Sequence, residues 1–143
     1  METTYAYLAG IIDIHGFISI NRRKSDGGYA TRIGLSDISP IIPNLAFAIF
    51  AGRVYQSSPR QATYHAFYMW EATHQQAREP LARLKPYLRL KQRHAEIALQ
   101  MLGLHHFHAR SVSVENRAER QRLFEEMERL NRNRRRRKEP ITG

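Results

Sequence analysis

"YLAGIIDIHGFISI", residues 7–20, carries the clearest structural signal in this 143-residue chain. Its first half has apolar residues at helical spacing, whereas "FISI" alternates apolar and polar residues as a half-buried strand does. Gly16 stands where the period changes, and a glycine in a left-handed conformation commonly ends a helix. We therefore predict a helix that begins after an N-cap at Thr3 or Thr4, runs to about Asp13 and leads directly into a strand.

Small residues mark one side of this predicted helix. Ala6 and Gly10 leave a stripe without bulky side chains, which allows another backbone to approach closely. The chain contains one copy of this segment, so a twofold dimer that pairs the helix with its own copy would fill the stripe. Packing of the same helix inside the monomer is the alternative.

Further along the chain, periodicity and turn residues predict the remaining elements. The predicted elements are a hairpin over 17–39 around "DGG", a helix from 41 to Gly52, a second hairpin over 53–72 around "SPRQA", and helices over 73–85, 95–103 and 116–130. This order predicts an α+β domain over residues 1–130, with a four-stranded antiparallel sheet that helices cover on one face. The arginine-rich residues 131–143 are expected to form a disordered basic tail.

The composition restricts the class of partner. The chain has 23 Lys and Arg against 13 Asp and Glu, a formal net charge of +10, which favours a polyanion and nucleic acid before acidic lipid. The absence of cysteine excludes disulfides and thiolate zinc sites. No apolar run reaches the roughly 18 residues of a membrane span, so we expect an intracellular protein without a membrane partner.

Polar residues alternate with apolar ones along the predicted strands, and residues two apart share one face of a sheet. These polar residues are Ser19, Asn21 and Arg23 on the first strand, Arg32 on the second, and Arg53, Tyr55 and Ser57 on the third. An ordinary solvated face would have the same alternation. If the partner is DNA, such a ribbon fits the major groove, and Arg22, Lys24, Arg60 and the tail arginines suit phosphates. His65 on the fourth strand has an ambiguous register.

The segment "LAGIIDIHG", residues 8–16, resembles the LAGLIDADG motif of homing endonucleases. The match comprises Leu8, Ala9, Gly10, Ile12, Asp13 and Gly16, with Ile11 as a conservative change. The two hairpins follow in the family's order, and "LKPYLRLKQRHAEIAL", residues 84–99, resembles the stretch after the family's second hairpin. The resemblance implies the αββαββα homing-endonuclease-like fold, α+β, with a four-stranded antiparallel saddle sheet backed by helices.

The resemblance also implies partners and an activity. Single-motif members pair through the motif helix, so the homodimer interface is expected at Ala6, Leu8, Ala9, Gly10 and Asp13. The two concave sheets would then lie in the major groove of double-stranded DNA over a roughly palindromic site. The implied function is site-specific, metal-dependent hydrolysis of phosphodiester bonds in both DNA strands.

His15 stands just before the last glycine of the motif, where the family has its metal-binding acid. The resemblance therefore makes His15 and Ile14 the metal-binding positions. An imidazole is a poor ligand for Mg²⁺ and a good one for Mn²⁺, Co²⁺ or Ni²⁺. Three interpretations stay open. His15 binds such a metal or acts as general base; a nearby carboxylate replaces it; or the protein is a non-cleaving repressor or RNA-splicing maturase on the same scaffold.

Two further residues match positions near the family's active site. Asp37 falls at the end of the second strand, where the family usually has a polar residue that orients water, and its carboxylate could supply the missing negative charge. A turn or helix-capping role is the alternative for Asp37. Lys91 matches a basic residue beside the active site, where an ammonium can stabilise charge on the reacting phosphate. A solvated lysine is the alternative there.

Overall fold

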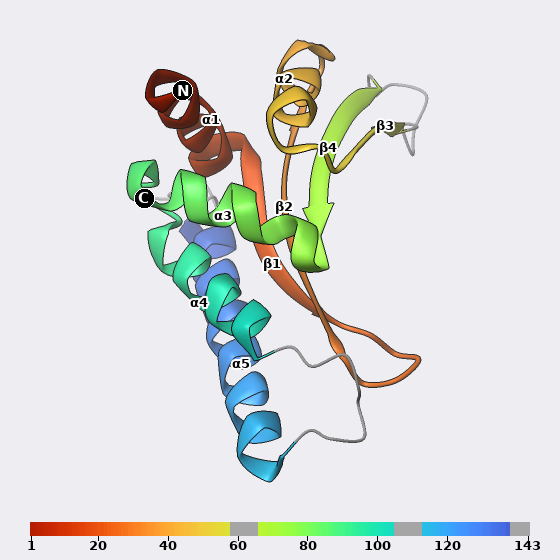
Figure 1. Cartoon of the computed structure of the whole chain (residues 1–143), viewed down its shortest axis with the longest axis vertical. Coiled ribbons are helices and arrows are strands. Elements are labelled where there is room, and N and C mark those ends of the chain that lie inside the picture. The colour runs from red at the N-terminus through yellow and green to blue at the C-terminus, as the bar shows by residue number, and fades with distance from the viewer. Residues whose placement is uncertain (58–65, 105–112, 138–143) are drawn as a thin grey trace, which may run out of the picture.

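The computed structural model describes residues 1–57, 66–104 and 113–137. Its elements, in chain order, are α1 (Glu2–His15), β1 (Gly16–Arg22), β2 (Tyr29–Asp37), α2 (Ile41–Phe50), β3 (Arg53–Ser57), β4 (Phe67–Thr73), the 3₁₀ turn η1 (His74–Ala77), α3 (Arg78–Leu84), the 3₁₀ turn η2 (Lys85–Tyr87), α4 (Gln92–Gly103) and α5 (Val114–Arg137). The predicted order of helices and strands is confirmed (Figure 1). Arg60 and His65 lie outside the described residues.

The four strands form one antiparallel sheet in the order β1-β2-β4-β3. Ile18 pairs with Ile33, and Leu35 pairs with Trp70, so apolar residues of neighbouring strands meet on the same face. In Figure 1, α1, α4 and α5 lie to one side of the strands, and α3 crosses from these helices toward the end of β4. All five helices contribute buried residues to one hydrophobic core with this inner face. The opposite face of the sheet, here called the outer face, does not belong to this core.

Trp70 is the largest fully buried side chain of the core. Its indole Nε1 donates a hydrogen bond to the carbonyl oxygen of Ala51, 2.7 Å away, at the end of α2. The ring also lies beside Phe50, with centroids 6.1 Å apart. A buried indole N–H needs such an acceptor, so this bond sets where α2 ends against β4.

The passage from α1 to β1 differs from the prediction. The helix continues to His15, and Gly16 has φ −115° and ψ −172°, which is extended rather than left-handed. Glycine is needed there for space: a Cβ would lie 2.6 Å from the carbonyl oxygen of Gly34 and 2.7 Å from Cα of Ile12. The expected left-handed helix stop is therefore wrong, because Gly16 is already the first residue of β1.

The C-terminal helix is longer than the periodicity predicted. α5 runs to Arg137, so residues 131–137 of the expected disordered tail have a helical backbone. The amide Nδ2 of Asn131 donates a hydrogen bond to the carbonyl oxygen of Ile18, 3.3 Å away, which ties this part of α5 to edge strand β1. Residues 138–143 lie outside the described part of the chain. Among the helices described, none combines the length and apolar character required to cross a membrane.

The C-terminal end of α1 is fastened by an exchange between Asp13 and the segment before α4. The Asp13 carboxylate accepts backbone hydrogen bonds from Arg89 (2.8 Å), Leu90 (3.2 Å) and Lys91 (3.0 Å). In return the Lys91 Nζ donates to the carbonyl oxygens of Ile12 (2.5 Å), Asp13 (3.2 Å) and Gly16 (2.7 Å). The last carbonyls of a helix have no partner inside it, and a cation there also interacts favourably with the helix dipole.

We expect Lys91→Met to lower the free energy of unfolding by about 1–3 kcal/mol, because the carbonyl oxygens of Ile12, Asp13 and Gly16 would each lose the hydrogen bond from Nζ. Methionine fills a similar volume, so the loss reports the hydrogen bonds rather than a cavity. Urea denaturation would measure it. Lys85→Met, at a half-buried lysine of η2, is the matched control and should change stability far less. Equal stabilities of Lys91→Met and the wild type would contradict this role.

Candidate functional site

The outer face of the sheet holds most of the predicted polar residues. In the register, Ser19 lies opposite Arg32, Arg53 opposite Glu71, Tyr55 opposite Met69 and Ser57 opposite Phe67. Their strand neighbours Ile18, Ile20 and Val54 point to the core side, so alternation places these side chains on the outer face. Asn21, opposite Ala30, belongs to the same face. Six of the seven predicted residues thus share one surface.

Arg23 is the exception, because β1 ends at Arg22. Its guanidinium Nε lies 3.2 Å from an Asp26 carboxylate oxygen, and its backbone N–H bonds to the carbonyl oxygen of Gly28, 2.7 Å away. The bond from the Gly28 N–H and the neighbouring Arg23 lower the pKa of the exposed Asp26 carboxyl. Arg23 therefore shapes the turn between β1 and β2, beyond the edge of the ordered sheet.

Glu71 of the inner strand β4 and Phe17 of edge strand β1, which the sequence did not single out, also lie on the outer face. Glu71, only 9% exposed, accepts a hydrogen bond from Nη2 of Arg32. The Arg32 guanidinium carbon lies 5.0 Å from the ring centroid of Phe17, and Arg53 stacks similarly on Tyr55 at 4.4 Å. A lone acid in the otherwise apolar strand "FYMWEAT" was the signal available for Glu71.

At the C-terminal end of α1, His15 and Asp37 line the same open pocket of about 510 Å³. The pocket wall consists of Tyr7, Ile11 and His15 from α1, Ser36, Asp37 and Ile38 at the end of β2, Ile42 of α2 and Phe67 of β4. Both His15 and Asp37 are exposed. The structure thus brings together two of the three residues that the sequence associated with catalysis.

Asp37 also makes a local hydrogen bond. Its Oδ1 accepts from the backbone N–H of Ile38 at 2.7 Å, whereas Ser39 Oγ accepts from the N–H of Ile41 at 3.2 Å, beside the start of α2. Ser39, rather than Asp37, therefore contacts the first residue of α2, whose N-cap position is Pro40. The carboxylate of Asp37 has a second oxygen, so the turn contact and a role in the pocket are compatible.

Lys91 does not lie where a catalytic lysine was expected. It is 2% exposed and its Nζ is bonded to carbonyl oxygens at the end of α1. A catalytic group must reach a reacting phosphate, and this ammonium is enclosed by protein. Lys91 is better described as a positioning residue, since it holds the carbonyl groups of Ile12 and Asp13 before His15 and that of Gly16 after it.

The residues expected at a dimer interface fall on two sides of α1. Leu8 and Ala9 are fully buried and Asp13 is 5% exposed, because the subunit's own core and the segment before α4 cover them. These three cannot contact a partner directly, which corrects that part of the prediction. Ala6 and Gly10 are exposed, and a Cβ added at Gly10 would meet nothing within 4 Å.

Metal-binding residues are few in the part of the chain that the structure describes. Within residues 1–57, 66–104 and 113–137, no three His, Asp or Glu side chains gather closely enough to hold an ion. His15 and Asp37 supply one imidazole and one carboxylate to the pocket, whereas Ile14 is exposed but is not part of its lining. This donor pair suits Mn²⁺, Co²⁺ or Ni²⁺ better than Mg²⁺, and further ligands would have to come from water, substrate or a second subunit.

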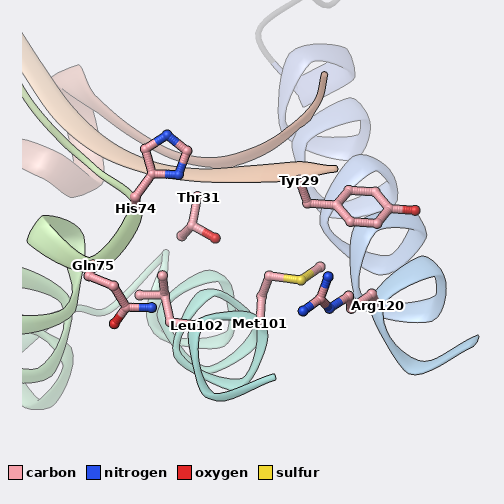
Figure 2. Close-up of a pocket in the computed structure, with 7 residues that line it drawn as sticks. All are labelled: Tyr29, Thr31, His74, Gln75, Met101, Leu102 and Arg120. Carbon is pink, nitrogen blue, oxygen red and sulfur yellow. The ribbon is translucent and has the colours of Figure 1, made fainter. Parts of the chain in front are cut away.

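A second pocket lies between the sheet and the C-terminal helices, and Figure 2 shows its lining residues. They are Tyr29, Thr31, His74, Gln75, Met101, Leu102 and Arg120. Its volume of about 20 Å³ is enough for roughly one water molecule and too small for a substrate. Burial lowers the pKa of the Arg120 guanidinium, which donates a hydrogen bond to the carbonyl oxygen of Leu104, 2.6 Å away. Because its lining includes the exposed residues His74 and Gln75, this small pocket lies at the edge of the core and not inside it.

Comparison with known proteins supports the sequence resemblance through the fold. No family model and no curated protein sequence matches the chain. The homing endonuclease I-CvuI, solved with its target in the presence of Ca²⁺, superposes with a TM-score of 0.68 and 20% identity over 90% of this chain and 82% of its own. I-CvuI with the I-CreI target and Mg²⁺, its DNA not cleaved, gives a TM-score of 0.71 at 18% identity.

Two other DNA complexes agree. An archaeal intron-encoded homing endonuclease complexed with DNA has a TM-score of 0.70 at 12% identity, over 90% of this chain and 84% of its own. The LAGLIDADG homing endonuclease I-GzeII, with its DNA target, has a TM-score of 0.64 at 13% identity and is matched over 44% of its length. The resemblance seen in the motif is thus confirmed, and the chain has the α+β fold of the LAGLIDADG homing endonucleases.

Proposed function

We propose that this protein is a homodimeric, site-specific DNA endonuclease that holds double-stranded DNA on the outer faces of its two sheets. The observation that carries the proposal is the pairing of that polar face with His15 and Asp37, which share a pocket at the end of the motif helix. The four solved structures compared above are homing endonucleases in complex with DNA. Residues 1–130 would form the endonuclease-like domain, with the end of α5 extending from it.

The outer face offers the chemistry that major-groove recognition requires. Arginine suits the O6 and N7 acceptors of guanine, and asparagine suits adenine, so Arg32, Arg53 and Asn21 are the candidate base-reading residues. Ser19, Tyr55 and Ser57 add hydroxyl groups to the same surface. Arg22 and Lys24 are exposed at the end of the β1–β2 hairpin and suit phosphate contacts. The net charge of +10 favours such a polyanion in general.

Homodimerisation would use the exposed side of α1. Ala6 and Gly10 permit close backbone approach, and Tyr7 and Ile14 expose 53% and 56% of their surface beside them. A twofold axis along this side would bring two copies of His15 near the middle of a roughly palindromic site. Each subunit would thereby contribute one pocket to the cleavage of one strand.

A divalent ion bound by His15 and Asp37 would polarise the scissile phosphate and lower the pKa of a bound water. The protein's own contribution is positional. The contacts of Asp13 and Lys91 hold the backbone on both sides of His15, so the imidazole has a defined place at the end of α1. The neighbouring apolar wall of Ile11, Ile38 and Phe67 would exclude bulk water from the reacting phosphate.

Gly10→Leu tests the dimer. Because the Cβ position at Gly10 is open within the subunit, the fold should survive, and the change even favours the helix by up to about 1 kcal/mol. At a helix pair in close contact, the added bulk should weaken association by about 1–3 kcal/mol. Sedimentation equilibrium would measure the dissociation constant of the dimer. Ala82→Leu, at an exposed alanine of α3, is the control and should leave it unchanged.

If Gly10→Leu and the wild type associate equally, the interface lies elsewhere.

His15→Asp tests the metal site. We expect the wild type to cleave better with Mn²⁺ than with Mg²⁺, and the variant to gain Mg²⁺-dependent cleavage, since a carboxylate is the harder ligand. Even outer-sphere partners of metals change activity by roughly 10–100-fold, so a direct ligand should do at least as much. Nicking of a plasmid that carries a selected target site is the measurement. His74→Asp, at a histidine outside the pocket, is the matched control.

A second candidate function is a non-cleaving DNA- or RNA-binding protein, such as a repressor or a maturase, on the same scaffold. The observation that favours it is the histidine in place of the motif's acid. Specific DNA binding without nicks in either metal, by both the wild type and His15→Asp, would support this second candidate and refute the endonuclease.

A further inference from the structure

We propose that Glu71 and Phe17 hold Arg32 in one orientation on the outer face of the sheet, so that Arg32 reads a guanine base and contributes little to phosphate binding. This inference rests on the proposed binding of DNA by the outer face. It makes Glu71 a positioning residue and assigns the base preference at one position of each half-site to Arg32.

The three side chains come from three neighbouring strands. Arg32 is on β2, Phe17 on edge strand β1 and Glu71 on β4. The Arg32 guanidinium lies over the Phe17 ring at 5.0 Å and donates through Nη2 to Glu71 Oε2. The side chain of Arg32 is 30% exposed and that of Glu71 is 11% exposed. The guanidinium is therefore held from two sides while part of it remains accessible.

Gly34 makes this arrangement possible. The register sets Phe17, Gly34 and Glu71 in one row across β1, β2 and β4. A Cβ at Gly34 would lie 2.6 Å from Cζ of Phe17, so the ring occupies the space that a side chain would fill on the outer face. Because Gly34 has no side chain, the Phe17 ring can lie over this position of β2 and reach the guanidinium of Arg32, two residues earlier on the same strand.

The chemistry of the pair favours base reading over phosphate binding. The bond to Glu71 uses one of the five N–H donors of a guanidinium, which leaves donors for the O6 and N7 atoms of guanine. The Glu71 carboxylate offsets the positive charge of Arg32, which reduces the attraction of Arg32 to phosphate. The remaining N–H donors of the guanidinium can still bond to a base edge. A side chain that is already ordered also loses less conformational entropy on binding.

Selection from a randomised double-stranded DNA library, with a chelator to prevent cleavage, would define the target and test the inference. Binding would then be measured for a panel of single base-pair substitutions. The wild type should prefer guanine at one position of each half-site by roughly 5- to 150-fold. Glu71→Ala should reduce that preference to less than about fivefold, keep the other preferences and bind unselected DNA more tightly.

Three other variants separate positioning from a structural role. Arg32→Lys keeps the charge and should lose the same preference, because an ammonium cannot bond in a bidentate way. Glu71→Gln keeps the shape and one acceptor oxygen, so an intermediate preference is expected even if Glu71→Ala folds poorly. Thr73→Ala, opposite Arg32 in the register on the same face, is the matched control and should retain the full preference.

The outcomes distinguish a positioning role of Glu71 from a purely structural one. Loss of one guanine preference in Arg32→Lys, with a partial loss in Glu71→Gln, supports the inference. A uniform loss of affinity in the Glu71 variants, with every base preference intact, would mean that Glu71 only stabilises the sheet and would overturn it. If the wild type enriches no sequence from the library, the proposed DNA-binding function itself fails, and the inference fails with it.

Discussion

The structure depends on the exchange of hydrogen bonds between α1 and the segment before α4. The Asp13 carboxylate accepts three backbone N–H groups of that segment, and the Lys91 ammonium donates to carbonyl oxygens at the end of α1. Both side chains are buried, and each supplies hydrogen-bond partners for backbone groups of the other segment. Two segments that are 75 to 79 residues apart are thereby joined at one point.

That point fixes the geometry of everything around His15. Gly16 begins β1 without an intervening loop, so the direction of the end of α1 also sets the direction of the sheet. His15 stands at the junction and faces the pocket that it shares with Asp37. The candidate catalytic pocket and the candidate DNA-binding face consequently adjoin one another where the end of α1 meets the start of β1.

Much of the outer face was predictable because strand periodicity is a local property. Ser19 and Asn21 follow the alternation with Ile18 and Ile20, and any extended backbone must place them on the face opposite the core. The prediction that Arg23 belongs to the same face followed this alternation and was wrong, because Arg23 makes turn contacts with Asp26 and Gly28 and the strand ends one residue earlier. Glu71 was not predicted, because its role comes from the hydrogen bond with Arg32. That partner is 39 residues away in the chain, and only the strand register brings it close.

The sequence by itself determined the order of elements, the motif with its small-residue stripe, the cationic charge and which strand residues point away from the core. These properties depend on residue type and on short-range spacing, which the chain carries in any conformation. Only the tertiary structure decided that Lys91 is enclosed, that Leu8 and Ala9 belong to the chain's own core, and that His15 and Asp37 line the same pocket. Burial and contact depend on how distant segments pack, and a lysine, a leucine or a histidine has no local pattern that reveals which neighbours it will have.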